Sequence, residues 1–350
     1  MKFEAIFGGP DRPRGYLRDK LSEHIVAVPS GGEIDWVTYY FRDRRLAQDL
    51  LQARHRGVRV RLTLEKSPRT GRANEQVLSM LSGPDGLGDG LRAVTHRLLP
   101  GLLWMPHLHE KIYCFSHPRP IALVGSFNPS GDDPETEPDV IDEILDHDRG
   151  HNLLVGIHGD ALVDGLVQHT RRMHDGGHGI LERFDTQLNE PLRDTDTTIH
   201  FWPRAGRDPL AKFLEQFGKG TKVRFAASHI KGPGSASNIA NLARRGATVE
   251  ILAESSLRRV PGSIEHRLLD AGVKITRYPM RENIPMHNKF ALIENHSARW
   301  TVFGSYNWTA RSRWLNHEVC VISRDLDIFN QIDQRWSELV KMPEESAVEA

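Results

Sequence analysis

The chain has 350 residues, of which 39% are hydrophobic and 26% charged, and its 46 basic residues are balanced by 46 acidic ones. This length suffices for one large or two ordinary globular domains, and the balanced charge excludes the global excess of Lys and Arg on which non-specific nucleic-acid binding depends. Because the sequence has no run of 18 apolar residues and no signal-peptide-like N-terminus, we expect a cytoplasmic protein without a transmembrane segment.

The first half of the chain predicts one amphipathic helix followed by short strands. In FRDRRLAQDLLQARHRG, residues 41–57, Leu46, Leu50 and Ala53 fall on one face, and Gly57 is expected to end the helix. Apolar or β-branched runs then predict strands at residues 58–65, 111–115, 121–126 and 153–157. Alternation of helices with such strands is typical of α/β proteins.

The second half shows the same alternation. We expect a Gly-rich and then polar linker at residues 176–198, followed by strands at residues 223–228, 248–254, 273–279, 289–294, 301–305 and 319–323. A helix is predicted over residues 263–272, with Ser263 as its N-cap and Gly272 at its end. Cys114 and Cys320 each lie in an apolar run, which indicates reduced core residues.

Two stretches of the chain repeat each other. HLHEKIYCFSHPRPIALVGSFNPS (residues 107–130) and MHNKFALIENHSARWTVFGSYNWT (residues 286–309) both read His-x-Lys, a strand, a loop, a strand and Gly-Ser-aromatic-Asn. Matching pieces precede them at residues 53–65 and 242–254, and follow them at residues 150–157 and 316–323. We therefore predict two homologous α/β lobes, residues 1–175 and 199–345, each a mixed, mostly parallel sheet flanked by helices, with the active site at their pseudo-twofold interface.

The repeated residues suit the chemistry of a phosphate ester. Side chains two apart on a strand share a face, so each imidazole projects beside an ammonium group. Gly-Ser-x-Asn can bring a hydroxyl and an amide to the same rim. Two such units would surround a tetrahedral anion, with lysines neutralising its oxygens and histidines serving as nucleophile and acid. The candidate residues are His109, Lys111, Ser126 and Asn128 in the first unit and His287, Lys289, Ser305 and Asn307 in the second.

The paired motifs resemble the phospholipase D superfamily, whose signature is H-x-K-x(4)-D followed by G-S-x-N. Ser116 and Glu294 stand where the signature has Asp, a position that is mostly structural in that family. Asn316-His317-Glu318 resembles the family's N-x-E, whose acid orients a catalytic histidine, and Asn152 occupies the corresponding first-half position. We expect Glu318 to be catalytic and Asn152 to contact the substrate, as do Ser126 and Ser305. An amide cannot stabilise an imidazolium as a carboxylate does.

The resemblance implies a ping-pong reaction without cofactor or metal. One histidine would form a phosphohistidine, and water or an alcohol would release the second product. The family usually uses the N-terminal histidine, here His109, as nucleophile, whereas Glu318 favours whichever histidine it contacts. The His107-x-His109 pair and His174 with His178 have no Cys or acidic residue at convincing metal-ligand spacing, so we predict no metal site.

Two classes of substrate fit these motifs, a phospholipid or other small phosphodiester and a single-stranded nucleic acid. A third hypothesis is a non-catalytic protein that binds phosphorylated ligands. GSYNWTARSRWLNHE (residues 304–318) resembles the corresponding run of cardiolipin synthases, which favours a phospholipid or another small phosphodiester and permits peripheral membrane contact. Its first six residues also resemble superfamily nucleases, which leaves single-stranded DNA or RNA as the alternative. One chain carries both units and would suffice for the active site. The acidic insertion at residues 132–148 is expected to gate the cleft or repel polyanions.

Overall fold

The computed structural model describes residues 2–96, 105–131, 149–179, 184–187, 189–279 and 284–348. A seven-stranded sheet forms the first lobe in the order β1-β7-β6-β5-β2-β3-β4. Its strands are β1 (Phe3–Phe7), β2 (Glu33–Thr38), β3 (Arg59–Glu65), β4 (Leu91–Val94), β5 (Ile112–Phe115), β6 (Ile121–Gly125) and β7 (Leu153–Ile157). The helices of this half are α1 (Tyr16–Ala27), α2 (Arg44–His55), α3 (Glu75–Ser82) and α5 (Asp160–Asp175).

An eight-stranded sheet forms the second lobe in the order β13-β12-β10-β14-β15-β17-β9-β8. Its strands are β8 (Leu192–Arg193), β9 (Thr197–Trp202), β10 (Lys222–Ala227), β12 (Thr248–Glu254), β13 (Lys274–Tyr278), β14 (Lys289–Glu294), β15 (Arg299–Gly304) and β17 (Glu318–Ser323). A separate pair joins β11 (Ile230–Lys231) to β16 (Trp308–Thr309). The helices are α6 (Pro209–Leu214), α7 (Pro233–Arg244), α8 (Gly262–Leu269), α9 (Ala310–Trp314) and α10 (Leu326–Val348).

The predicted α/β class with two lobes of mixed sheet is confirmed, but the sheets are not mostly parallel. Within the two large sheets, only the described β2-β3-β4 and β10-β12-β13 segments pair in parallel. The remaining pairings of both large sheets are antiparallel, including β5 with β6 and β14 with β15. The physical reason lies in the connections, because the short loops inside each repeated motif make hairpins, whereas only longer helical crossovers give parallel neighbours.

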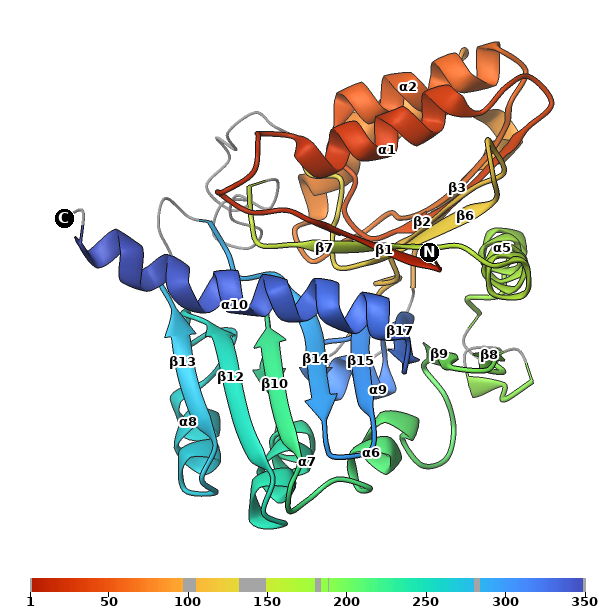
Figure 1. Cartoon of the computed structure of the whole chain (residues 1–350). Coiled ribbons are helices and arrows are strands. Elements are labelled where there is room, and N and C mark those ends of the chain that lie inside the picture. Colours follow the sequence, from red (N-terminus) through yellow and green to blue (C-terminus); the bar gives the residue numbers. More distant parts are fainter. Residues whose placement is uncertain are drawn as a thin grey trace.

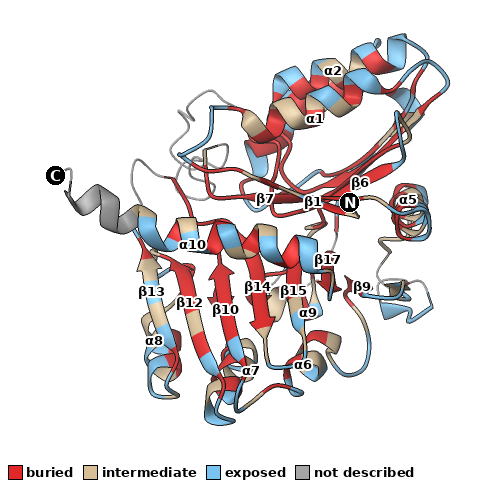
Figure 2. Ribbon diagram, viewed as in Figure 1, coloured by how far each residue is buried: buried red, intermediate tan, exposed pale blue. Residues whose placement is uncertain are grey.

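In Figure 1 the two sheets lie one above the other with α10 along their boundary, and a cluster of buried apolar side chains joins them. Helix α5 packs on the first sheet and α10 packs against β1, β14 and β15, so the long C-terminal helix touches both lobes. One buried cluster joins side chains of both sheets with those of α5 and α10, among them Phe3, Ile112, Phe290 and Ile332. Figure 2 shows the central strands of both sheets mostly buried, whereas the edge strand β13 is largely intermediate or exposed and α1 and α2 alternate buried and exposed positions. The lobes are therefore joined through a common core.

Local signals near the first motif agree with the sequence. Helix α2 begins after Asp43, whose side chain accepts a hydrogen bond from the backbone N–H of Leu46, and the predicted face of Leu46, Leu50 and Ala53 is fully buried. Gly57 follows the helix with φ of 90°, a backbone conformation that favours glycine. The predicted cap of the second-half helix is wrong, because α8 begins at Gly262, before Ser263, and Pro261 precedes it without a side-chain cap.

Several elements differ from the predicted organisation. The expected linker at residues 176–198 contains β8 and the start of β9, which pairs with β17 inside the second sheet. The lobe boundaries stay a prediction, and the acidic insertion at residues 132–148 lies outside the described residues.

Both cysteines are buried and free, as expected. Over the described part of the chain, no helix is long and apolar enough to cross a bilayer.

Candidate active site

Each His-x-Lys motif begins on a short segment that is held by the opposite lobe. Leu108 forms an isolated parallel bridge with His317, and His109 N–H donates to the carbonyl of His317 at 2.9 Å. In the second motif, His287 N–H donates to the carbonyl of His151 at 3.0 Å. Docking of the lobes therefore positions the backbone of both candidate histidines.

His109 is oriented by a carboxylate from the other half of the chain. Its Nδ1 lies 2.8 Å from Oε2 of Glu318, the first residue of β17. Glu318 is fully buried and also accepts hydrogen bonds from the hydroxyls of Ser305, at 2.5 Å, and Ser312, at 2.7 Å. An ionised carboxylate fixes the proton of His109 on Nδ1 and leaves the Nε2 lone pair available for attack.

His287 has the corresponding arrangement with an amide in place of the acid. Its Nδ1 lies 2.8 Å from Oδ1 of Asn152, and the Ser126 hydroxyl donates to the same oxygen at 3.2 Å. Each histidine is thus held by a residue of the other lobe, but only His109 receives a full negative charge. This geometry answers which histidine Glu318 contacts.

The two lysines lie behind the histidines. Lys111 Nζ donates to the carbonyl of His109 at 2.7 Å, while Lys289 Nζ lies 3.0 Å from both Nε2 and the carbonyl oxygen of His287. Burial lowers the pKa of Lys111 to about 7, against the opposing attraction of Glu318. Burial also places the pKa of Lys289 well below its usual value, and the nearby Lys111 charge adds to that shift. A bound anion would favour the charged form of both ammonium groups.

Burial likewise disfavours charge on His109. Desolvation lowers its pKa to about 4, although the adjacent Glu318 acts in the opposite direction. For Glu318, burial raises the pKa, but His109 and Lys111 outweigh that effect, so the net pKa shift is downward. His109 is therefore a neutral imidazole beside an ionised carboxylate at neutral pH, which is the state required of a nucleophile.

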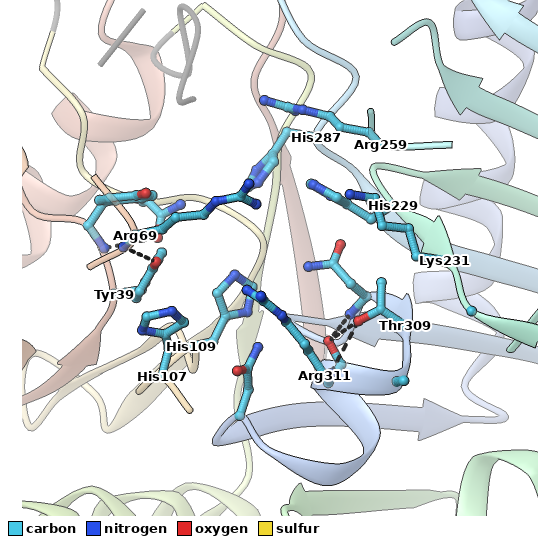
Figure 3. A pocket seen from close by; sticks show the side chains of 17 residues that line it. Tyr39, Arg69, His107, His109, His229, Lys231, Arg259, His287, Thr309 and Arg311 are labelled. Atoms are coloured by element: carbon cyan, nitrogen blue, oxygen red, sulfur yellow. Dashed lines mark hydrogen bonds between the residues drawn. The ribbon is translucent and has the colours of Figure 1, made fainter. Parts of the chain in front are cut away.

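Both histidines line one cavity of about 400 Å³ between the lobes (Figure 3). Asn128 and Asn307, the amides of the two Gly-Ser-x-Asn motifs, line the same cavity. Glycine at position 125 permits the tight packing of the first motif, because a Cβ there would lie 2.0 Å from the carbonyl oxygen of Leu153. The structure thus brings the predicted pair of motifs to a single space.

Ser126 and Ser305 do not lie on the cavity wall, and neither does Asn152. Their polar atoms face the groups that orient the histidines, so the geometry supports positioning in place of the substrate contact we predicted. The signature departures are remote from the chemistry: Ser116 Oγ accepts from the N–H of Glu33 at 2.8 Å, and Glu294 pairs with Arg224 at 2.9 Å. No cluster suited to a metal ion occurs among the described residues.

Sequence reasoning missed a matched pair of acids and most of the cavity wall. Glu65 and Glu254 end β3 and β12, and their carboxylates accept the N–H of Leu108 at 2.8 Å and of Met286 at 2.7 Å. These N–H groups immediately precede the two histidines. The repeat of residues 53–65 and 242–254 ends at these acids and could have revealed them. The wall residues that the sequence did not indicate include Tyr39, Tyr40, Arg69, His229, Lys231 and Arg259.

A family model described as cardiolipin synthase, PLD-like domain, matches residues 29–139 and 215–340. Among solved structures, phosphatidylserine synthase from Haemophilus influenzae Rd KW20 is similar, with 12% identity, a TM-score of 0.65, and coverage of 97% of this chain and 86% of that one. Polyphosphate kinase from Porphyromonas gingivalis is similar with 16% identity and a TM-score of 0.59, over 95% of this chain. The match spans only 46% of the polyphosphate kinase chain. No curated protein matches the sequence significantly.

Proposed function

The chain belongs to the phospholipase D-like domain family, and from that premise we propose that it cleaves or exchanges a phosphodiester through a phosphohistidine. The observation that carries the proposal is the placement of His109 and His287 on one cavity, each held at Nδ1 from the opposite lobe. This arrangement leaves Nε2 of His109 to act as a nucleophile and Nε2 of His287, which lies 3.0 Å from Lys289 Nζ, to act as an acid.

His109 is the proposed nucleophile. Its Nε2 lone pair forms a bond to phosphorus while the bond to the leaving oxygen breaks, and that oxygen takes a proton from Nε2 of the protonated His287. Water or an alcohol then gives a proton to His287 as its oxygen attacks phosphorus, which breaks the P–N bond and restores His109. The phosphorylated imidazole is cationic, and the Glu318 carboxylate 2.8 Å from its Nδ1 stabilises it.

The lysines supply positive charge without a divalent ion in this mechanism. Lys111 and Lys289 are buried directly behind the imidazoles, where the low local dielectric strengthens their attraction to the phosphoryl oxygens. Asn128 and Asn307 contribute neutral hydrogen-bond groups at the cavity wall. We therefore propose that catalysis persists in EDTA.

A phospholipid or another small phosphodiester is the first candidate substrate. The run from Gly304 to Glu318 resembles that of cardiolipin synthases, and the matching family model carries the same description. A single-stranded nucleic acid is the second candidate, supported by Gly-Ser-Tyr-Asn-Trp-Thr and by the four Arg and Lys side chains on the cavity wall. The intact histidines and lysines of both motifs argue against a protein that only binds phosphate.

The mechanism is tested with bis(p-nitrophenyl) phosphate in EDTA. We expect hydrolysis by the wild type, loss of it in His109→Ala and His287→Ala, and full activity in the matched control His55→Ala, which changes an exposed histidine. Mass spectrometry of acid-sensitive phosphate after rapid quenching should locate the adduct on His109. Retained activity in either active-site variant would refute the shared site.

The substrate class is tested by incubating the protein with mixed liposomes or with labelled single-stranded DNA. Release of a lipid headgroup, or its transfer to an added alcohol, would support the first candidate. Degradation of the DNA alone would support the second and exclude the lipid preference.

A further inference from the structure

A histidine of the second-lobe wall has no part in the proton transfers proposed above. His229 follows β10, precedes β11 and lines the cavity. The carbonyl of His229 accepts the N–H of Trp308 at 3.1 Å, and the N–H of the preceding Ser228 donates to the carbonyl of Asn288 at 3.0 Å. Its backbone is thus fixed by both parts of the second motif. Figure 3 shows the ring of His229 directed from the second lobe into the cavity.

The repeat places a different side chain at the corresponding position of the first lobe. Val37 of β2 and Ala226 of β10 pair with the residues that follow the two motif lysines. The third residue after Val37 is Tyr40, and the third residue after Ala226 is His229. Both line the cavity. The two lobes therefore differ in this wall position, with a phenol in the first and an imidazole in the second.

A hydrogen bond at one ring nitrogen fixes the tautomer of His229. Its Nδ1 lies 2.9 Å from Oγ of Ser228, a fully buried hydroxyl. Among the described residues, this ring nitrogen is the sole hydrogen-bond partner of that hydroxyl. If Nδ1 carried the proton, the hydroxyl hydrogen would be buried without an acceptor, which is unfavourable. The hydroxyl therefore donates to Nδ1, and the imidazole proton lies on Nε2.

Nε2 of His229 is available as a neutral donor. No described group forms a hydrogen bond with it, and the atom is not fully buried. Desolvation lowers the pKa of His229 well below its usual value. The basic groups that add to this shift are Arg259, Lys289, Lys231 and His109.

The neutral tautomer limits what His229 can do. With its proton on Nε2 and its Nδ1 lone pair engaged by Ser228, the ring can act neither as a nucleophile nor as a base. It can donate a hydrogen bond, and the strongest acceptors that a phosphodiester offers are its anionic non-bridging oxygens.

We propose that His229 is a further catalytic residue, whose Nε2–H donates a hydrogen bond to a non-bridging oxygen of the phosphoryl group as phosphorus is attacked. The inference rests on the proposed function for the place of that group between His109 and His287. A fixed neutral donor stabilises the oxygen without competing for the proton that His287 transfers.

Substitution of His229 by phenylalanine keeps a planar ring but removes the N–H. In EDTA, we expect kcat for bis(p-nitrophenyl) phosphate to decrease about a hundredfold in His229→Phe, the usual loss when one donor to the reacting oxyanion is removed. His229→Gln, whose amide can donate from a similar position, should retain about ten times the activity of His229→Phe or more. The matched control His296→Phe, which changes an exposed histidine of the second lobe, should retain wild-type kcat. Thermal unfolding of each variant reports whether the fold is kept.

Sulfur substitution distinguishes a hydrogen bond to the phosphoryl group from a structural role. Methyl p-nitrophenyl phosphorothioate has two enantiomers, which place sulfur, a weak acceptor, at one or the other non-bridging position. His229→Phe should slow the enantiomer whose oxygen faces residue 229 more than the one whose sulfur faces it, which changes the ratio of their kcat/KM values by about threefold or more. A side chain that only supports the fold would slow both enantiomers equally. An unchanged ratio in a folded His229→Phe variant would therefore overturn the proposal.

The pH profile tests whether His229 takes part in proton transfer. Because the ring stays neutral, neither limb of the kcat/KM profile should move in His229→Phe. A displaced limb would show that His229 acts as an acid or a base and would contradict the donor role.

Binding of vanadate, which mimics five-coordinate phosphorus, gives a readout that does not depend on turnover. By calorimetry, His229→Phe should bind vanadate about tenfold more weakly than the wild type or weaker still. Equal vanadate affinity together with an unchanged enantiomer ratio would overturn the donor role while leaving hydrolysis of bis(p-nitrophenyl) phosphate intact. Absence of that hydrolysis in the wild type, with vanadate binding still dependent on His229, would instead refute the proposed function alone.

Discussion

Replacement of Glu318 by glutamine tests the asymmetry of the two histidines most directly. The substitution keeps the shape of the side chain but removes a charge about 4 Å from the centre of the His109 ring, whose Nδ1 lies 2.8 Å from the carboxylate. At an effective dielectric constant of about 20, two unit charges at about 4 Å attract by about 4 kcal/mol. Since the phosphorylated imidazole is cationic, the loss corresponds to a decrease of about a thousandfold in kcat.

The assay is steady-state hydrolysis of bis(p-nitrophenyl) phosphate by Glu318→Gln, with thermal unfolding measured in parallel. Glu215→Gln is the matched control, because it changes an exposed glutamate on the second lobe. The Ser305 and Ser312 hydroxyls donate to different oxygens of Glu318, so in the variant one of them can donate to the glutamine oxygen and the other can accept from the amide N–H, and we expect the fold to persist. A folded variant with more than a tenth of wild-type kcat would show that the carboxylate is not needed to stabilise His109, and the reasoning would fail.

Three further outcomes follow from the same geometry. His109, with a pKa of about 4, is protonated and cannot attack below that pH, so kcat/KM should decrease below about pH 4. Lys111, with a pKa of about 7, loses its charge above that pH, so kcat/KM should also decrease above about pH 7. In the kcat profile, which reports the complex with the anion bound and the lysines charged, the alkaline limb reflects loss of the proton from His287. Asn152→Asp should move this limb to higher pH, because a carboxylate at Nδ1 would stabilise the imidazolium of His287. An unchanged limb would contradict the role of His287 as the acid. Thr309→Ala should lower the free energy of unfolding by about 1 kcal/mol in urea titration, since the Thr309 hydroxyl caps α9, whereas no change would refute the cap.

The sequence repeat carried most of the predictable information. It located both His-x-Lys motifs, both Gly-Ser-x-Asn motifs and the strands between them, because each is short, local and present twice. Helix α2 was equally predictable, since the residues of its apolar face and Gly57 lie close together in the sequence. Strand β2 was not predicted, because Asp35 interrupts its apolar pattern. In the structure Asp35 is buried and forms ion pairs with Arg61 and Arg171.

Contacts between the lobes could not be predicted from periodicity. The sequence identified Glu318 as an orienting acid but left open which histidine it contacts, because that choice depends on how the second sheet docks on the first. Ser126 and Ser305 were expected at the substrate for a different reason, because spacing alone does not reveal that their hydroxyls face Asn152 and Glu318 at the end of the neighbouring strand of their own lobe. Arginines such as Arg69 lie on loops, where sequence carries no periodic signal for the direction of a side chain.

The exchange of orienting partners between the lobes has a consequence for any division of the chain. His109 and its partner Glu318 lie 209 residues apart in different lobes, and His287 and its partner Asn152 lie 135 residues apart in different lobes. A recombinant fragment that contains one lobe alone would lack the residue that orients its own histidine. We therefore expect neither lobe, expressed by itself, to catalyse the proposed reaction.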